Sequence, residues 1–156
     1  AGMALFLTIF IMAPVWQKIN TDAIQPYMAE QITDQEAWNI GIEPLQSFME
    51  KQTGKEEAAL FVELSGAKKD ATTKRIPLEA LIPAFMISEL KTAFQLGFLI
   101  YLPFLVIDLV IASSLMSLGM MMLPPMMISL PVKLLFFVLA DGWTLMIRGM
   151  VSSFSL

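Results

Sequence analysis

The chain has 156 residues and a formal net charge of −4; 56% of its residues are apolar and only 15% are charged. A soluble globular domain carries roughly 25% charged residues, so this composition excludes an ordinary soluble domain. The chain contains no Cys and no His, which excludes thiol nucleophiles, disulfides, imidazole bases and most zinc sites. An acidic pI of about 4.7 without a basic stripe argues against a nucleic-acid-binding surface.

Residues 1–16 form the first segment, which is apolar and precedes the first charge, Lys18. The run is shorter than the roughly 20 residues of a membrane-spanning helix and lacks the basic start of a signal peptide. We therefore expect the C-terminal part of a truncated apolar helix, with Trp16 as an interfacial anchor.

Residues 17–81 form a polar insertion. Between Lys18 and Arg75 it contains ten Asp or Glu and seven Lys or Arg. Thr33 with Glu36, and Thr53 with Glu56, fit the capping-box spacing and predict two helix starts. The second start leads into an amphipathic run with Leu60, Phe61 and Leu64 on one face, which should end at Ser65 and Gly66. The charged stretch 67–75 is predicted to be a loop.

Residues 82–156 are predicted to form a kinked helical hairpin. Its apolar arms are Thr92–Leu118 and Met126–Met150. The joining segment 119–125 begins with Gly and ends with two Pro residues, which stop the first helix. Pro103 and Pro131 should kink the arms, and Asp141-Gly142-Trp143 indicates a further kink or a membrane-border anchor.

Asp108 and Lys133 are the only charged residues between Thr92 and Ala140. An ionisable group in a membrane needs protein, water or an opposite charge beside it. Three interpretations follow: the two form an ion pair, within one subunit or between neighbours; Asp108 is a proton relay; or each lies at a water-exposed edge. A paired arrangement would fix one register of an assembly.

Met residues gather at the tip of the hairpin, where Met120, Met121 and Met122 are consecutive. Their flexible, polarisable side chains adapt to irregular neighbours. A loop of this composition suits a hydrophobic seal that closes a pore by dewetting. The alternative is core filling or lipid contact.

Glu89 and Lys91 stand two residues apart at the entrance to the first apolar arm and cannot face each other on a helix. Each must find another partner, in solvent or in a neighbouring subunit. No group of residues predicts a metal site, a cofactor site or a catalytic site, so we expect no enzyme.

Five motifs in this order are similar to those of the FliP/SctR family: Ser88-Glu89-Leu90-Lys91-Thr92-Ala93-Phe94-Gln95, Pro103 to Ser113, Gly119-Met120-Met121-Met122-Leu123-Pro124-Pro125, Leu130-Pro131-Val132-Lys133-Leu134, and Asp141-Gly142-Trp143. The resemblance extends more loosely through Gln25-Pro26-Tyr27 and Pro44-Leu45. This family forms the export gate of flagellar and virulence type III secretion. The Met triplet and the Leu-Pro-Pro sequence favour the flagellar branch.

The resemblance implies an all-α protein whose integral-membrane-type helical hairpins pack in a multisubunit ring. With copies of itself and FliQ-like, FliR-like and FlhB-like partners it would form a conduit for unfolded export substrates. By the same resemblance Met120, Met121 and Met122 seal the pore, Asp108 and Lys133 form an intersubunit pair, and Glu89 and Phe61 lie at subunit contacts.

The resemblance also implies a place in the bacterial inner membrane and the flagellar basal body, with the insertion and part of the assembly on the periplasmic side. The positive-inside rule does not oppose this, because it weakens for loops of about 60 residues. Two other function classes remain open from the residues: a proton-coupled transporter or stand-alone channel using Asp108, and a membrane assembly factor without a passage of its own.

Overall fold

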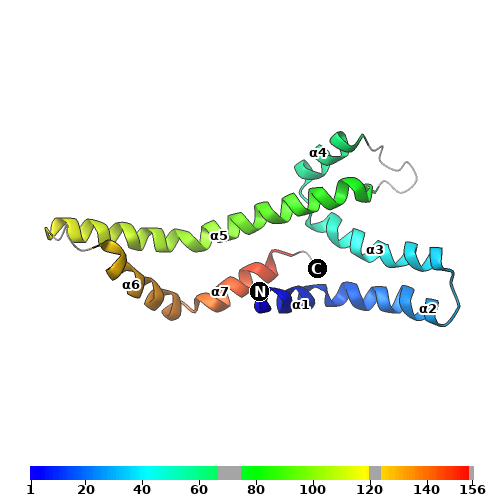
Figure 1. Cartoon of the computed structure of the whole chain (residues 1–156), viewed down its shortest axis with the longest axis horizontal. Coiled ribbons are helices and arrows are strands. Elements are labelled where there is room, and N and C mark those ends of the chain that lie inside the picture. Colours follow the sequence, from blue (N-terminus) through cyan, green and yellow to red (C-terminus); the bar gives the residue numbers. More distant parts are fainter. Residues whose placement is uncertain (67–74, 120–123, 155–156) are drawn as a thin grey trace. The chain divides into compact units, whose positions relative to one another are not determined.

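The computed structural model describes residues 1–66, 75–119 and 124–154, and every regular element in these ranges is a helix, which confirms the predicted all-α class (Figure 1). Two described helical runs, Gly2–Met28 and Leu78–Ser117, are long and apolar enough to cross a membrane. The bent pair Pro125–Leu139 and Gly142–Ser152 is a third candidate span if its two helices are counted as one. The chain divides into two compact units, Ala1–Lys91 with Phe154–Leu156, and Thr92–Ser153.

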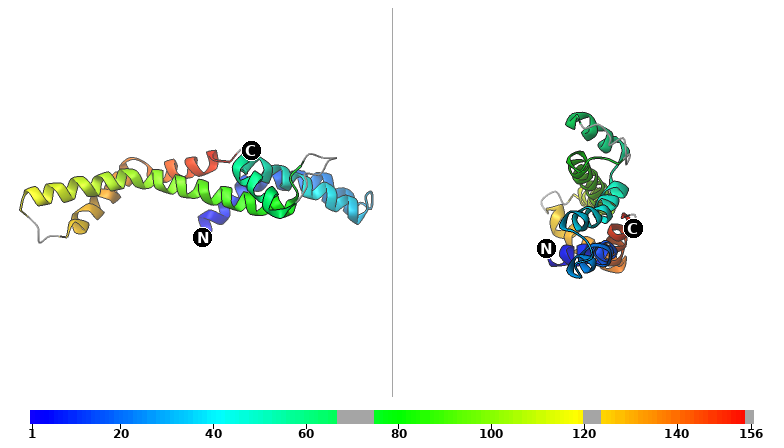
Figure 2. Two further views of the ribbon diagram at one scale, coloured as in Figure 1. Left: turned by 90° about the horizontal axis from the view of Figure 1, so that it is seen from above. Right: turned by 90° about the vertical axis from the view of Figure 1, so that its right-hand side faces the viewer.

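The first unit begins with one continuous helical run made of α1 (Gly2–Ile19), the π-helix η1 (Asn20–Ile24) and α2 (Gln25–Met28). This run packs beside α3 (Asp34–Gln52) (Figure 1 and Figure 2). Small residues allow the approach: a Cβ on Gly41 of α3 would lie 3.5 Å from Cβ of Ala23. The apolar helix therefore continues past Trp16 into the polar insertion.

The start of α3 has the predicted capping box at Thr33. The Thr33 hydroxyl accepts from the backbone N–H of Glu36 at 3.4 Å, and the Glu36 carboxylate accepts from the backbone N–H of Thr33 at 2.9 Å. The second predicted capping box is wrong. Thr53 ends α3 instead, and its hydroxyl donates to the Met49 carbonyl at 2.7 Å. Gly54 is the N-cap of the next helix and provides no side chain to cap it.

That helix, α4 (Lys55–Ser65), is followed by its C-cap residue Gly66, whose φ of 62° is left-handed. The predicted stop is confirmed, since glycine adopts this conformation without steric strain. The predicted apolar face is largely uncovered: Leu60 and Leu64 are 49% and 70% exposed, and no residue of α4 is buried. The predicted loop at 67–75 lies almost wholly outside the described residues.

The core of the first unit lies where the start of α5 (Leu78–Ser117) meets α3. Ala80, Leu81 and Ala84 of α5 are at most 1% exposed. Phe48 of α3 lies 6.2 Å, between ring centroids, from both Phe85 and Phe154. The first apolar arm, expected from Thr92, thus begins as a helix at Leu78, because its first turns pack into this core.

The second unit contains the rest of α5 with α6 (Pro125–Leu139) and α7 (Gly142–Ser152). Helices α5 and α6 continue through Pro103 and Pro131 without interruption. The second predicted arm is broken after Ala140, and the two helices meet at 65°. The break lies at Asp141, whose φ is 50°, so the interpretation of Asp141-Gly142-Trp143 as a kink is confirmed.

The described surface of the second unit is strongly apolar. Phe94, Leu118 and Leu139 are each more than 70% exposed. No residue in the most apolar stretch of α5 is buried. Because such patches mark membrane or protein contacts, this unit has an apolar surface that lipid or other subunits must cover.

Candidate functional site

An ion pair lies within the apolar second unit. The ammonium of Lys133 on α6 lies 2.6 Å from Oδ2 of Asp108 on α5, and the two side chains are 25% and 33% exposed. Helix α6 also places Ser129, one turn before Lys133, beside Asp108, and the Ser129 hydroxyl donates to the Met126 carbonyl at 3.5 Å. Ser129 is 3% exposed. The structure therefore brings the two expected charged residues together within one chain.

Sequence reasoning did not identify Ser129. Its signal is its spacing, because residues four apart share one face of a helix and Ser129 stands four residues before Lys133. One face of α6 thus places an ammonium in contact with the Asp108 carboxylate and a hydroxyl near it. This arrangement reduces the desolvation penalty that a lone carboxylate would have in an apolar region.

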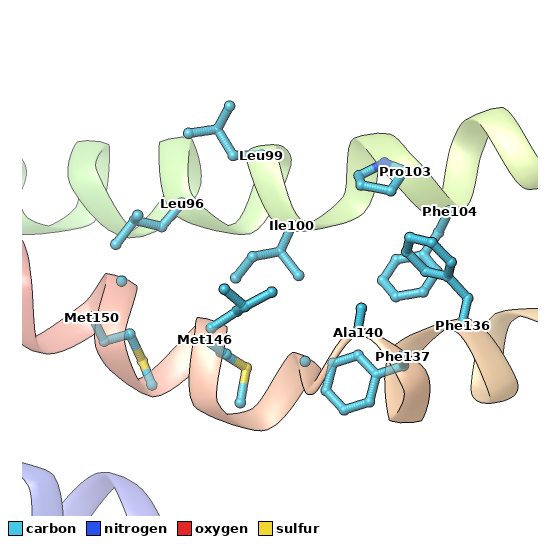
Figure 3. Close-up of a pocket in the computed structure, with 13 residues that line it drawn as sticks. Leu96, Leu99, Ile100, Pro103, Phe104, Phe136, Phe137, Ala140, Met146 and Met150 are labelled. Carbon is cyan, nitrogen blue, oxygen red and sulfur yellow. The ribbon is translucent and has the colours of Figure 1, made fainter.

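An apolar cavity of about 310 Å³ lies in the second unit, beside the break between α6 and α7 (Figure 3). Leu96, Ile100 and Phe104 line one side and follow one another at four-residue spacing along α5. Met146 and Met150 of α7 line the other side (Figure 3). The cavity has no charged residue in its lining, so it suits only apolar contents.

Aromatic rings close one end of this cavity. The ring centroid of Phe104 lies 6.2 Å from that of Phe136 and 6.3 Å from that of Phe137. The ring centroids of Phe137 and Trp143 lie 5.1 Å apart in an edge-on contact. A Cβ on Gly142 would collide with the Phe137 ring. The break at Asp141-Gly142 therefore depends on a glycine that admits this ring.

The expected seal residues Met120, Met121 and Met122 lie outside the described residues. The structure describes the residues on both sides of them. Gly119 has a φ of 71° and ends the preceding turn, whereas Pro124 is extended and precedes α6. Both flanks have backbone conformations that stop a helix.

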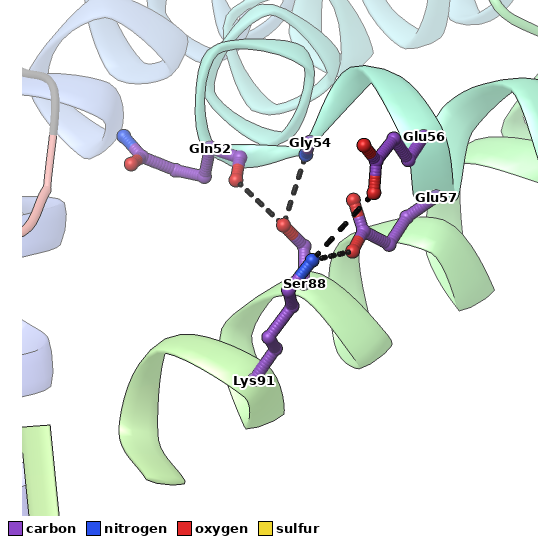
Figure 4. Close-up of polar contacts among 6 residues, drawn as sticks. All are labelled: Gln52, Gly54, Glu56, Glu57, Ser88 and Lys91. Carbon is purple, nitrogen blue, oxygen red and sulfur yellow. Dashed lines mark hydrogen bonds and ion pairs between the residues drawn. The ribbon is translucent and has the colours of Figure 1, made fainter. Parts of the chain in front are cut away.

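The two residues expected at subunit contacts, Glu89 and Phe61, lie in the first unit on α5 and α4. Both are partly exposed, and within the described ranges Glu89 forms no ion pair. Lys91 has the partner that the sequence demanded: its ammonium lies 2.9 Å from Glu57 and 3.9 Å from Glu56 (Figure 4). The hydrogen bond from Lys91 holds the pKa of the Glu57 carboxyl below its usual range.

The described part of the chain holds no cluster of three or more acidic residues placed to bind a metal ion. Some of its acidic side chains pair with Lys or Arg instead, as Glu43 does with Arg75 at 2.9 Å. The chemistry that this arrangement supports is therefore packing and charge pairing.

Comparison with known proteins gives consistent matches. The FliP family model matches residues 1–150. The chain is 54% identical over 153 residues to the flagellar biosynthetic protein FliP of Bacillus subtilis, covering 98% of this chain and 69% of that protein. It is 51% identical to the FliP of Caulobacter vibrioides and 48% identical to that of Pectobacterium carotovorum, each over 98% of this chain.

The chain spans 58% and 59% of the Caulobacter and Pectobacterium proteins. The match nevertheless includes all five motifs from Ser88 to Trp143. It confirms the resemblance found in the sequence, and with it the expectation of a non-enzymatic protein: the chain belongs to the FliP family.

Proposed function

We propose that the chain is a core subunit of the flagellar type III export gate. As a member of the FliP family it is a component of that export system, and the family match is the observation that carries the proposal. Copies of the chain would surround a conduit for unfolded protein substrates in the bacterial inner membrane, at the flagellar basal body. Its candidate membrane helices support this location.

The apolar surface of the second unit supports assembly with other chains. Residues such as Phe94 and Leu139, at 77% and 76% exposure, need a cover that one chain does not supply. We assign this cover to further copies and to FliQ-like, FliR-like and FlhB-like subunits. Glu89 and Phe61 would contribute to contacts between copies in the first unit, toward the periplasm.

The seal of the conduit would be the methionine loop, Met120 to Met122. A ring of copies places one such loop per subunit around an axis and produces a continuous apolar collar, which a single chain cannot form. Unbranched Met side chains can close on one another and yield to a passing chain. The helix-stopping residues Gly119 and Pro124 support a loop at this position.

Native mass spectrometry of the full-length protein, co-expressed with its FliQ-like and FliR-like partners and extracted in mild detergent, tests the proposal. A discrete complex with several copies of this chain and both partners is expected. A monomer or a simple dimer, under conditions that preserve other membrane complexes, would contradict the proposal that the chain is a gate subunit.

Changing Met120, Met121 and Met122 together to Ala tests the seal. Resting cells should leak ions while they still export substrate, because smaller side chains leave the collar open. The matched control changes Met126 and Met127 to Ala. These two residues lie on α6, outside the loop, and are 78% and 69% exposed. Unchanged permeability in the triple variant would refute the seal.

The competing function is a proton-coupled transporter or stand-alone channel in which Asp108 titrates. The 2.6 Å contact with Lys133 supports the structural role instead. Asp108→Asn separates the two: a relay loses transport with assembly intact, whereas a structural pair loses assembly. A membrane assembly factor, the third class, would show no change of permeability in the Met variants.

A further inference from the structure

The elbow between α3 and α4 is bound by a side chain of a third helix. Ser88 of α5 is 7% exposed. Its hydroxyl oxygen accepts a hydrogen bond from the Gly54 N–H at 2.9 Å and donates one to the Gln52 carbonyl at 3.2 Å (Figure 4). One hydroxyl therefore satisfies backbone groups on both sides of the elbow.

Helix α4 depends on this outside support. It has 11 residues, none of them buried, and its N-cap residue Gly54 has no side chain to cap it. Isolated helices shorter than about 12–15 residues are marginal in water, and uncapped terminal N–H groups weaken them further. Neither a buried side chain of α4 nor an N-cap side chain thus holds this helix in place.

Lys91, one turn after Ser88, binds the first turn of α4. Its ammonium lies 2.9 Å from Glu57, whose side chain is only 12% exposed, although Lys91 itself is 52% exposed. A Cβ on Gly54 would collide with the Glu57 carboxylate. A larger residue at position 54 would therefore force the Glu57 carboxylate to shift from its place over the elbow. We name Ser88, Lys91, Gly54 and Glu57 the elbow clamp.

We propose that Ser88 and Lys91 are positioning residues that hold α4 on α5 for subunit assembly. Phe61 lies four residues after Glu57 and shares its face of α4, so the clamp that orients Glu57 also orients Phe61. Glu89 lies between the two clamp residues on α5. The clamp thus fixes the relative placement of the two residues assigned to the subunit contact; this last step rests on the proposed function.

Hydrogen–deuterium exchange of the full-length protein in detergent tests the clamp. Ser88→Ala and Lys91→Gln should each raise the exchange rate of the α4 amides, 55–65, by about tenfold, the effect of losing one hydrogen bond to a polar or charged group. Exchange in α3 and in α5 beyond residue 95 should stay unchanged. Lys91→Arg should restore protection, because it keeps the charge.

Ser113→Ala is the matched control, since Ser113 lies on the same helix and its hydroxyl donates to the Leu109 carbonyl at 2.8 Å. It should leave α4 unchanged. Lys91→Gln changes an exposed position and keeps the buried Ser88 intact, so it remains informative if Ser88→Ala folds poorly. Unchanged exchange of α4 in both clamp variants would overturn the clamp.

Native mass spectrometry of the same variants tests the link to assembly. Fewer copies of this chain per complex in Lys91→Gln, with recovery in Lys91→Arg, is the expected result. Faster α4 exchange with a normal complex would overturn the positioning role. A normal complex in Phe61→Ala and Glu89→Ala would instead refute the subunit contact itself, while the exchange result on the clamp would still stand.

Discussion

The ammonium of Lys133 and the carboxylate of Asp108 lie 2.6 Å apart within one chain, in a unit whose surface is otherwise mostly apolar. The family resemblance assigns these residues to a pair between subunits. In the single chain the carboxylate already has two polar neighbours, Lys133 and Ser129. The pair therefore joins α5 to α6 within one chain, and it links the helices that precede and follow Met120 to Met122.

Lys133→Ala should destabilise the chain and reduce its assembly. Removing the ammonium leaves Asp108 as an uncompensated charge, which is more harmful than removing both partners. We expect the melting temperature of the detergent-extracted protein to fall by about 2–4 °C, with a matching loss of complex in native mass spectrometry.

Lys133→Arg is the control for this variant, because it preserves the positive charge at a position that is 25% exposed. It should retain most of the complex. The double variant Asp108→Asn with Lys133→Ala should be less damaging than Lys133→Ala alone, since no unpaired charge remains. Wild-type stability of Lys133→Ala would contradict the role of the pair.

Thr33 and Thr53 have the same spacing to a following Glu but different structures. Only Thr33 caps a helix, whereas Thr53 ends α3. Thr33→Ala should therefore lower the free energy of unfolding by about 1 kcal/mol, the usual contribution of an N-cap, and Thr53→Ala by less. Chemical unfolding of the two variants in detergent measures the difference; equal losses would contradict the assignment.

These two sites also indicate what the sequence can predict. A capping box is a local signal, and at Thr33 it identified a helix start correctly. At Thr53 the local pattern failed because Ser88, which lies 34 residues after Gly54, binds the elbow in its place. A contact between distant segments overrode the local preference, and a single sequence does not reveal such a contact.

In the candidate site, too, the sequence predicts some features and does not reveal others. Opposite charges at Asp108 and Lys133 could be predicted as a pair because no other charged residue lies between Thr92 and Ala140. The break after Ala140 was foreseen only as a kink, since the structure requires both a left-handed Asp141 and a ring against Gly142. Ser129 escaped notice because a serine in an apolar helix ordinarily bonds its own backbone, as the Ser129 hydroxyl also does here with the Met126 carbonyl.

Acid should loosen the contact between α4 and α5. The hydrogen bond from Lys91 lowers the pKa of Glu57 below its ordinary value of 4.5. A carboxyl with a lowered folded-state pKa contributes its full stabilisation above the ordinary value and loses it as pH falls through the folded-state pKa. Exchange of α4 amides, corrected for the intrinsic effect of pH, should therefore rise below pH 4.5 and stay constant between pH 5 and 7.

Glu57→Gln separates this effect from general acid unfolding. The variant has no carboxyl at this position, so its α4 should exchange faster at neutral pH and show little further change on acidification. The Glu36 carboxyl at the Thr33 capping box, whose pKa is also lowered, remains intact in this variant and serves as an internal reference. The same acid response of α4 in Glu57→Gln and wild type would exclude Glu57 as the cause.

Gly142→Ala should disrupt the break between α6 and α7. The added Cβ would collide with the Phe137 ring, which itself packs edge-on against Trp143 at 5.1 Å. Forcing the ring aside should destabilise the protein by about 1–3 kcal/mol, as overpacking usually does, and should change the tryptophan fluorescence.

Gly149→Ala is the matched control on α7, because a Cβ there meets nothing within 4 Å. Ala is favoured over Gly inside a helix, so this variant should be neutral or slightly stabilising. If the two variants melted at the same temperature, the Phe137 ring would not be what makes a glycine necessary at this break.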